Sequence, residues 1–192
     1  TVLGGRAGGM PEMIFEYILK NHGIDPRNDL TIVQNIDFGS TAAAFSGGQG
    51  DYSIEFEPYA AALEEQGDGV VLASLGVDSG YVPYTAYCVK KSYMEKENNK
   101  LQEFTNAIQK GLDYVNSHSP EEIAEVIAPQ FKETSPQTIA VIVERYQKQD
   151  TWKETTRFEK DSFELLKDIL KDNSELKEDV PYEKLVTTQY SM

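Results

Sequence analysis

The sequence is poor in cysteine, histidine and basic residues. Its 192 residues include 1 Cys and 2 His, and 32 acidic side chains outnumber 18 basic ones. A single cysteine, Cys88, excludes an internal disulfide and a zinc site built from several cysteines. Basic residues are scarcest in residues 1–86, which contain 12 acidic and 3 basic side chains. Clustered Lys and Arg bind phosphate, so the composition argues against a nucleic-acid partner and against an anionic membrane surface.

Long hydrophobic runs are also missing. No stretch reaches 18 consecutive apolar residues, so the sequence contains no candidate for a membrane-spanning helix. The hydrophobic share of 40% is ordinary for a globular protein and allows a core without disulfides. The sequence starts "TVLGGR", without Met or a signal peptide, and we interpret it as part of a longer protein. The missing signal therefore says nothing about compartment.

Residues 1–94 alternate strand and helix patterns. Met13, Ile14, Tyr17 and Ile18 form one apolar stripe of a helix over 11–21, with Pro at its first turn and Gly just past its end. Further helices are predicted at 40–50 and 59–67, and strands at 1–5, 30–36, 51–57, 69–75 and 84–94. Short connections between alternating elements predict an α/β fold with a mostly parallel sheet of four or five strands.

After residue 94 the sequence predicts helices and no strand. Four helical segments cover 100–118, 119–131, 135–149 and 159–172. Ser119 and Ser135, each followed by Pro, are predicted N-caps, and Asp161 or Ser162 is the predicted cap of the fourth helix. The change of character places a boundary near residues 86–95.

The order of several motifs resembles a known family. The motifs are, in order along the chain, "GGRAGGMPE", "GGQGDYSIEFEP" and "SYMEKENNKLQEFTNAIQKGLDYVNSHSPEEIAEVIAP". These segments resemble solute-binding proteins of ABC importers, in the branch that handles nitrate, aliphatic sulfonates, taurine and thiamine-pyrimidine precursors. The resemblance implies a periplasmic-binding-protein type II-like lobe with a mostly parallel sheet, followed by a helical C-terminal tail. Residues 1–90 would be the second lobe, and residues 91–192 would pack on a first lobe outside this sequence.

The same resemblance implies a function and a location. The protein would capture a small-molecule solute between two lobes and deliver it to an ABC permease, without a cofactor and without chemistry. It would be extracytoplasmic, either periplasmic or lipid-anchored at the cell surface. Without a first lobe we expect weak solute binding, and we expect self-association through the apolar stripes of residues 100–170. Two other classes stay open: a pyrimidine-precursor synthase of the same fold, and the effector-sensing lobe of a transcription regulator.

The first group of candidate ligand-binding residues lies in the opening turn, which holds four glycines in seven residues. It comprises Arg6, Gly8, Gly9 and Met10. Backbone N–H groups at the start of a helix can hold a carboxylate, sulfonate or phosphate oxygen, and Arg6 can add a charge-assisted bond. The alternative is a tight strand-to-helix turn without a ligand, with Arg6 in solvent.

Two further groups follow the next predicted strands. In the first, Phe38, Ser40 and Thr41 stand where a helix begins, and the hydroxyls either cap that helix or donate to a ligand. In the second, Glu55 and Glu57 lie at the carboxyl end of a strand and share one face. These carboxylates suit a cationic or amine-bearing ligand, or they are simply acids on a solvated strand edge.

The remaining candidates are aromatic or unusual residues. Tyr81 and Tyr84 either form an aromatic wall for a ligand or pack into the core. His22 and His118 lie near helix ends and 96 positions apart, a spacing that does not indicate a metal site. Cys88, in an apolar segment, is interpreted as a buried hydrophobic side chain. No nucleophile–base pattern or phosphate-binding loop is present.

Overall fold

The computed structural model describes residues 1–191, which form two compact units. Unit 1 comprises Thr1–Val82 and Leu165–Glu178, and unit 2 comprises Pro83–Glu164 and the described residues from Asp179 onward. The predicted domain boundary at residue 90 remains a prediction, because compact units are not the same as ligand-binding lobes. The return of residues 165–178 to unit 1 could not be anticipated from local sequence patterns.

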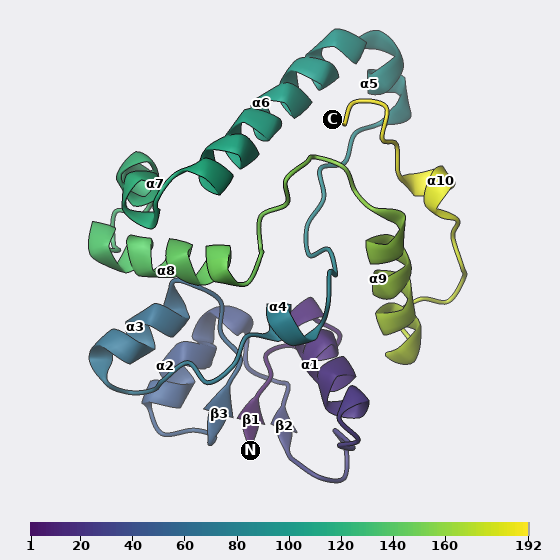
Figure 1. Ribbon diagram of the computed structural model, residues 1–192. Coiled ribbons are helices and arrows are strands. Elements are labelled where there is room, and N and C mark those ends of the chain that lie inside the picture. The colour runs from purple at the N-terminus through teal and green to yellow at the C-terminus, as the bar shows by residue number, and fades with distance from the viewer. Residues whose placement is uncertain (192) are drawn as a thin grey trace. The chain divides into compact units, whose positions relative to one another are not determined.

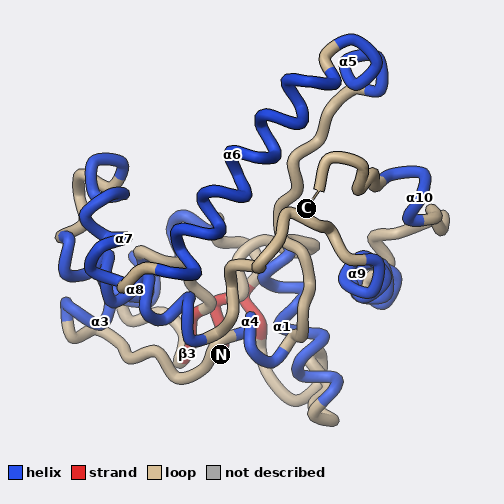
Figure 2. The backbone as a smooth tube through the Cα atoms, turned by 45° about the horizontal axis from the view of Figure 1, so that its top comes forward, coloured by secondary structure: helices blue, strands red, loops and turns tan. Residues whose placement is uncertain are grey.

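Unit 1 contains a parallel sheet of three short strands. They are β1 (Val2–Leu3), β2 (Ile32–Val33) and β3 (Tyr52–Ser53), in the order β2-β1-β3 (Figure 1; strands are red in Figure 2). Val2 pairs with Ile32 on one side and with Tyr52 on the other. Because β1 is central, its Leu3 is almost fully buried. The α/β fold with a parallel sheet is therefore confirmed.

The helices of unit 1 follow the strands closely. They are α1 (Met10–Asn21), the 3₁₀-helix η1 (Phe38–Ser40), α2 (Thr41–Ser46), α3 (Tyr59–Gln66) and α4 (Leu75–Asp78). In α1, Pro11 lies in the first turn and Lys20 in the last, as the ends of helices favour. After α1, Gly23 has φ +74° and the N–H of Ile24 reaches Leu19 O at 2.9 Å, which ends the helix.

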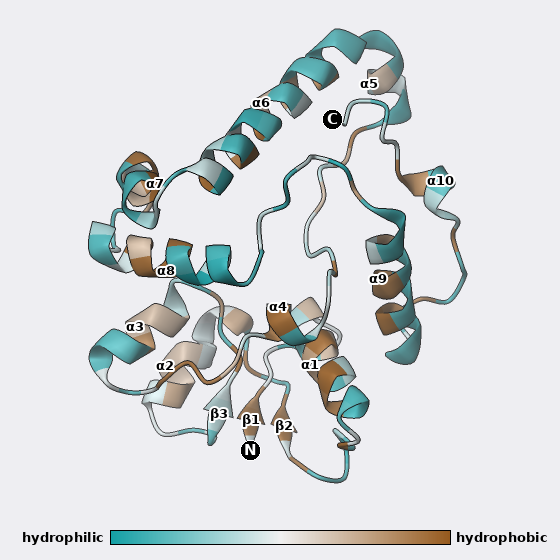
Figure 3. Ribbon diagram, viewed as in Figure 1, coloured by the Kyte–Doolittle hydropathy of each residue, from teal (hydrophilic) through white to brown (hydrophobic). Residues whose placement is uncertain are grey.

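The core of unit 1 joins the first helix to the end of α9 (Lys160–Asp172). Met13, Ile14 and Ile18 of the predicted apolar stripe pack against Ile169, which is fully buried. Figure 3 shows brown hydrophobic turns in both α1 and α9. Part of the apolar stripe of α9 is thus covered within unit 1, so it needs no partner outside the chain.

Two predicted strands are wrong. Residues 69–74 run without a strand partner in the described chain, with Val70 74% and Leu72 71% exposed, and the N–H of Val71 bonds Glu64 Oε1 instead of a neighbouring strand. Residues 84–90 have no strand either, and helix α5 (Lys91–Lys96) follows them. β-Branched residues favour a strand only where a neighbour can complete the hydrogen-bond ladder. The described sheet therefore has three strands instead of four or five.

Unit 2 is helical. Besides α5 and the first turn of α9 it contains α6 (Asn98–Ser117), α7 (Pro120–Ile127), the 3₁₀-helix η2 (Ala128–Gln130), α8 (Pro136–Lys148) and α10 (Tyr182–Leu185). As predicted, no strand occurs between residues 95 and 191 of the described chain. Helices α7 and α8 bury Ile123, Ile139 and Val143 against each other. This pairing leaves Val126 60% and Val141 49% exposed.

The predicted helix starts hold for two helices of unit 2. Ser119 Oγ accepts the N–H of Glu122, whose side chain accepts the N–H of Ser119 in return, which is a complete capping box. Ser135 Oγ accepts the N–H of Thr138. The predicted cap of the fourth helix is wrong, because α9 begins at Lys160 and Asp161 lies in its first turn. An acidic side chain there complements the helix dipole without being the cap.

Within residues 1–191, each helix falls short of the length and hydrophobicity needed to span a membrane.

Candidate functional site

The candidate site lies where the three parallel strands of unit 1 end. Their carboxyl ends share one edge of the sheet, which we call the carboxyl edge, and this is where open α/β sheets bind ligands. After β1 comes the opening turn with its four glycines, residues 4–9, which we call the glycine turn. Gln34 follows β2, and Glu55 follows β3. The fold therefore gathers three segments that are far apart in the sequence.

The N–H groups of Gly8 and Gly9 donate hydrogen bonds to acceptors close by in the sequence. The N–H of Gly9 donates to Arg6 O at 3.0 Å, and the N–H of Gly8 donates to Glu12 Oε2 at 3.1 Å. Gly8 has φ +69°, a conformation that favours glycine. The N–H groups of Gly8 and Gly9 therefore already have acceptors within the turn and the first turn of α1. Arg6 is exposed, and Met10 is the first residue of α1.

Glu12 is the residue that sequence reasoning missed. It is only 3% exposed, and its second carboxylate oxygen, Oε1, accepts a hydrogen bond from Gln34 Nε2. Burial, followed by the neighbouring Glu16 carboxyl, raises the pKa of Glu12 from 4.5 to about 7, against the bonds from Gly8 and Gln34. Gly9 is the N-cap of α1, so Glu12 is three residues after the cap. That spacing is the acidic half of a capping box and could have identified it.

A second polar cluster surrounds Glu55. Thr41 is fully buried, and its Oγ1 lies 2.8 Å from Phe38 O and 3.1 Å from Glu55 Oε2. Ser53 Oγ donates to the other oxygen of Glu55, Oε1. Burial raises the pKa of the Glu55 carboxyl, although both hydroxyl bonds act to lower it. Thr41 and Glu55, which belong to separate candidate groups, therefore come together at the carboxyl edge.

Aromatic side chains connect this cluster to the glycine turn. The rings of Phe38 and Phe56 lie 4.7 Å apart between centroids, at 53°. Phe38 also packs on Gly5, where an added Cβ would come within 2.5 Å of its Cδ2. Gly5 is thus a close-approach glycine, and Phe38 links the end of β1 to the start of η1.

The other predicted site residues take different roles. Glu57 Oε2 accepts the N–H of Ala61 at 2.9 Å, so this carboxylate satisfies the start of α3. Ser40 is at the N-cap position of α2 but makes no side-chain cap bond. Tyr81 is 58% exposed in unit 1, while Tyr84 belongs to unit 2. Whether any of the predicted residues contacts a ligand remains a prediction.

The histidines lie at helix ends, and the cysteine belongs to unit 2. As expected, His22 and His118 stand directly after the last residues of α1 and α6. Cys88 is exposed, so its interpretation as a buried side chain is wrong. Among the described residues, His, Cys, Asp and Glu form no group of three or more that could hold a metal ion.

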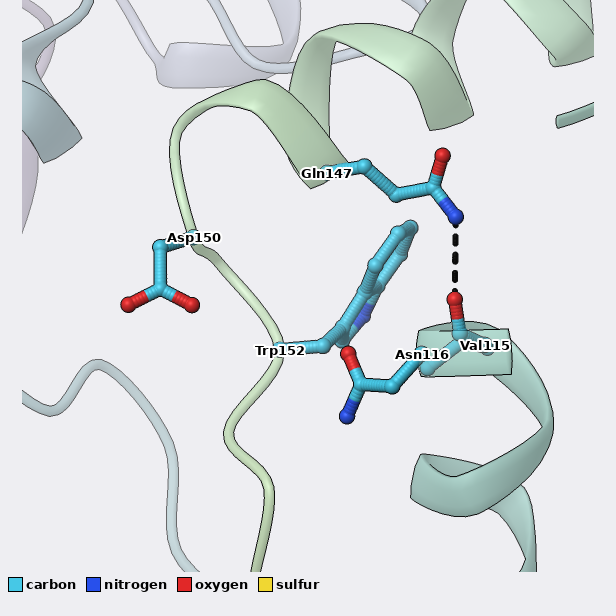
Figure 4. Close-up of a pocket in the computed structure, with 5 residues that line it drawn as sticks. All are labelled: Val115, Asn116, Gln147, Asp150 and Trp152. Atoms are coloured by element: carbon cyan, nitrogen blue, oxygen red, sulfur yellow. Dashed lines mark hydrogen bonds between the residues drawn. The ribbon is translucent and has the colours of Figure 1, made fainter. Parts of the chain in front are cut away.

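Unit 2 contains a small polar pocket of about 200 Å³, drawn in Figure 4. It lies between the end of α6 and the end of α8, with the ring of Trp152 standing between Gln147 and Asn116. Gln147 Nε2 donates to Val115 O at 2.9 Å and to His118 O at 3.1 Å, so this amide caps the carbonyls at the end of α6. Asn116 Nδ2 donates to Lys153 O at 3.0 Å. Both amides hold the helices and the following loop together.

Comparison with known proteins shows the family to which this chain belongs. A protein of Bacillus subtilis strain 168 named "Putative binding protein YtlA" is 41% identical to this chain over 189 residues. The alignment covers 98% of this chain and 57% of that relative, so the chain spans little more than half of the relative's length. Residues 4–129, which include the glycine turn and the carboxyl edge, match the NMT1-like family. The chain is a member of the NMT1-like family.

Proposed function

We propose that the protein is the solute-binding component of an ABC importer and that unit 1 supplies one side of its ligand site. The carboxyl edge carries this proposal, because it gathers half-buried carboxylate, hydroxyl and aromatic groups at the place where such sheets bind ligands. Family membership and the name of the Bacillus relative support a binding role. The solute, the permease and the importer are our proposal.

The ligand is a small molecule of the kinds that the family resemblance implies: a sulfonate, nitrate or taurine-like compound, or a thiamine-pyrimidine precursor. The side chains at the carboxyl edge favour the last kind. Glu55 is an acceptor when ionised, and Phe38 and Phe56 offer aromatic surface. An aminopyrimidine would present N–H donors to carboxylates and a flat ring to aromatic side chains.

We propose that the protein binds without chemistry. The pyrimidine synthase that shares this fold relies on a histidine and a cysteine-rich stretch, whereas this sequence has 1 Cys and 2 His. Within unit 1, His22 follows the C-terminal end of α1, the opposite end from the glycine turn. We place the working protein outside the cytoplasm, in the periplasm or on a lipid anchor, where importer components collect solutes.

The test is a solute panel followed by NMR. Amide spectra of this chain would be recorded with an aminopyrimidine, taurine, methanesulfonate and nitrate. We expect the aminopyrimidine to perturb Gly5, Gln34 and Glu55, with millimolar affinity because one lobe supplies only part of the contacts. E55Q should weaken the perturbation, while E65Q, an exposed glutamate of α3, should leave it unchanged. Perturbations confined to unit 2, or turnover of any of these compounds, would count against the proposal.

Self-association of this chain is a separate expectation. Pairing of α7 with α8 covers much of the apolar surface we had expected to be open, and Val126 and Val141 remain exposed. We propose that these residues mediate weak dimerisation. Light scattering at increasing concentration should show a rising mass that V126D abolishes. A constant monomer mass at the highest concentration would refute this.

A further inference from the structure

We propose that Glu12 makes the glycine turn selective against anionic groups, because its carboxylate occupies the N–H of Gly8, a backbone donor that such a group could otherwise use. This inference rests on the proposed function and narrows its ligand class. The carboxyl edge would accept a solute that presents N–H or cationic groups, and would reject one that presents a sulfonate, carboxylate or phosphate to the turn.

The first step is the state of the N–H groups of Gly8 and Gly9, the two glycines that directly precede α1. Helix starts attract anions because their N–H groups lack acceptors within the helix. Here the N–H of Gly8 donates to Glu12 Oε2, and the N–H of Gly9 donates to Arg6 O. An external anion would have to displace Glu12 to reach Gly8.

The second step is that Glu12 is held from two sides. Gln34 Nε2, from the segment after β2, donates to Oε1 while Gly8 donates to Oε2. Both oxygens therefore have donors, and the side chain is almost entirely buried. Displacing Glu12 would break both bonds and leave buried groups without partners, which is costly.

The third step is a second carboxylate at the same turn. Glu175, which follows α9, lies against Gly8: an added Cβ on that glycine would be 2.8 Å from Glu175 Oε1. Glu175 is exposed. It adds a negative charge beside the turn, while the N–H of Gly8 donates to Glu12. Glu55 carries a further carboxylate at the end of β3. The carboxylates at this edge are thus acceptors, and their complement is a donor; the exposed guanidinium of Arg6 is the cation of the same turn.

The experiment uses sulfate as the probe and the Gly8 and Gly9 amide signals as the readout. Spectra of ¹⁵N-labelled chain would be followed during a sulfate titration at constant ionic strength and at pH 8. Wild type should show no saturable shift at these amides. E12A, which frees the N–H of Gly8 and opens space beside it, should show a saturable shift in the millimolar range, and E12A/E175A should show a larger one.

E175A alone is the matched control. It removes one negative charge from the same turn but leaves the Gly8 N–H bonded to Glu12, so sulfate should still have no effect. E12Q keeps a neutral acceptor of the same shape and should also exclude sulfate.

Three results obtained with folded proteins would overturn the inference. They are a saturable sulfate shift in wild type, an equal response in E175A and E12A, and no response in a folded E12A. If E12A loses its dispersed spectrum, E12S replaces it, since serine leaves similar space. Unfolding of both variants would also overturn the inference, because Glu12 would then be structural and not selective. None of these results depends on finding the natural solute, so they leave the proposed function standing.

Discussion

Gln34 donates a side-chain hydrogen bond to Oε1 of Glu12, although the two residues are 22 positions apart in the sequence. Gln34 follows β2, and Glu12 lies in the first turn of α1. The bond ties two neighbouring strand ends together through a buried carboxylate. Removing this hydrogen bond, or changing the charge of Glu12, should therefore change both the stability of unit 1 and the ligand preference of the carboxyl edge.

Stability should depend on pH through Glu12. Its pKa is about 7 in the folded protein and 4.5 by itself, so the folded state favours the protonated carboxyl. The stabilisation is complete below pH 4.5 and is lost as pH rises through about 7. Relative to E12Q, wild type should lose roughly 3 kcal/mol over this interval, measured by urea unfolding.

Other charged groups around Glu12 must be separated from this effect. Glu16 and Lys20 lie along the same helix, Arg6 lies in the turn, and Glu175 contacts Gly8. The variant E175Q, at an exposed carboxyl beside the turn, should keep the wild-type pH dependence. Parallel stability curves for wild type and E12Q would show that Glu12 is not the titrating group.

Gly8→Ala should destabilise unit 1 more than Gly23→Ala. Both glycines have positive φ, so both variants incur backbone strain of about 1–2 kcal/mol. An added Cβ at Gly8 also meets Glu175, whereas at Gly23 nothing lies within 4 Å. The difference between the two variants in thermal unfolding isolates the contact with Glu175. In an E175A background the two substitutions should destabilise the protein equally. If Gly8→Ala still costs more than Gly23→Ala there, the difference does not come from contact with Glu175.

Ser135→Ala should destabilise unit 2 by about 1 kcal/mol, because it removes the acceptor for the N–H of Thr138 at the start of α8. Ser40 is the matched control. It has the same position relative to α2 but makes no side-chain cap bond, so S40A should leave stability unchanged within error. Denaturant midpoints measured in parallel would test this, and equal losses in both variants would refute the assigned roles.

Gln109→Leu should destabilise unit 2 by about 2–3 kcal/mol. The buried amide of Gln109 donates to Glu154 O at 2.7 Å and accepts the N–H of Thr156 at 3.0 Å, so it holds the segment after α8 against α6. Leucine has a similar volume but leaves these backbone groups without partners. Hydrogen exchange at Thr156 should rise sharply in Q109L and stay unchanged in K110A, the exposed neighbour. Retained protection at Thr156 in Q109L would contradict this role.

The carboxyl edge was partly predictable. A glycine turn before a helix and acids after a predicted strand directed attention to Gly8 and Glu55, because parallel strands end at one edge. The capping roles of Glu57 and Glu12 were not anticipated, since each depends on which backbone N–H lies within reach. The exposed side chains of Val70 and Leu72 explain the missing strand at 69–75: their β propensity required a neighbour that the described sheet does not provide.

The sequence by itself determined the local elements. Prolines and serines set where α7 and α8 begin, glycine set where α1 ends, and the apolar stripe of α1 set its buried face. These outcomes depend on interactions within a few residues. Tertiary structure decided the rest: that Ile169 returns to cover α1, that Gln34 reaches Glu12, and that Glu175 lies on Gly8. These partners lie between 22 and more than 150 positions apart, and only the folded chain brings their side chains within contact distance.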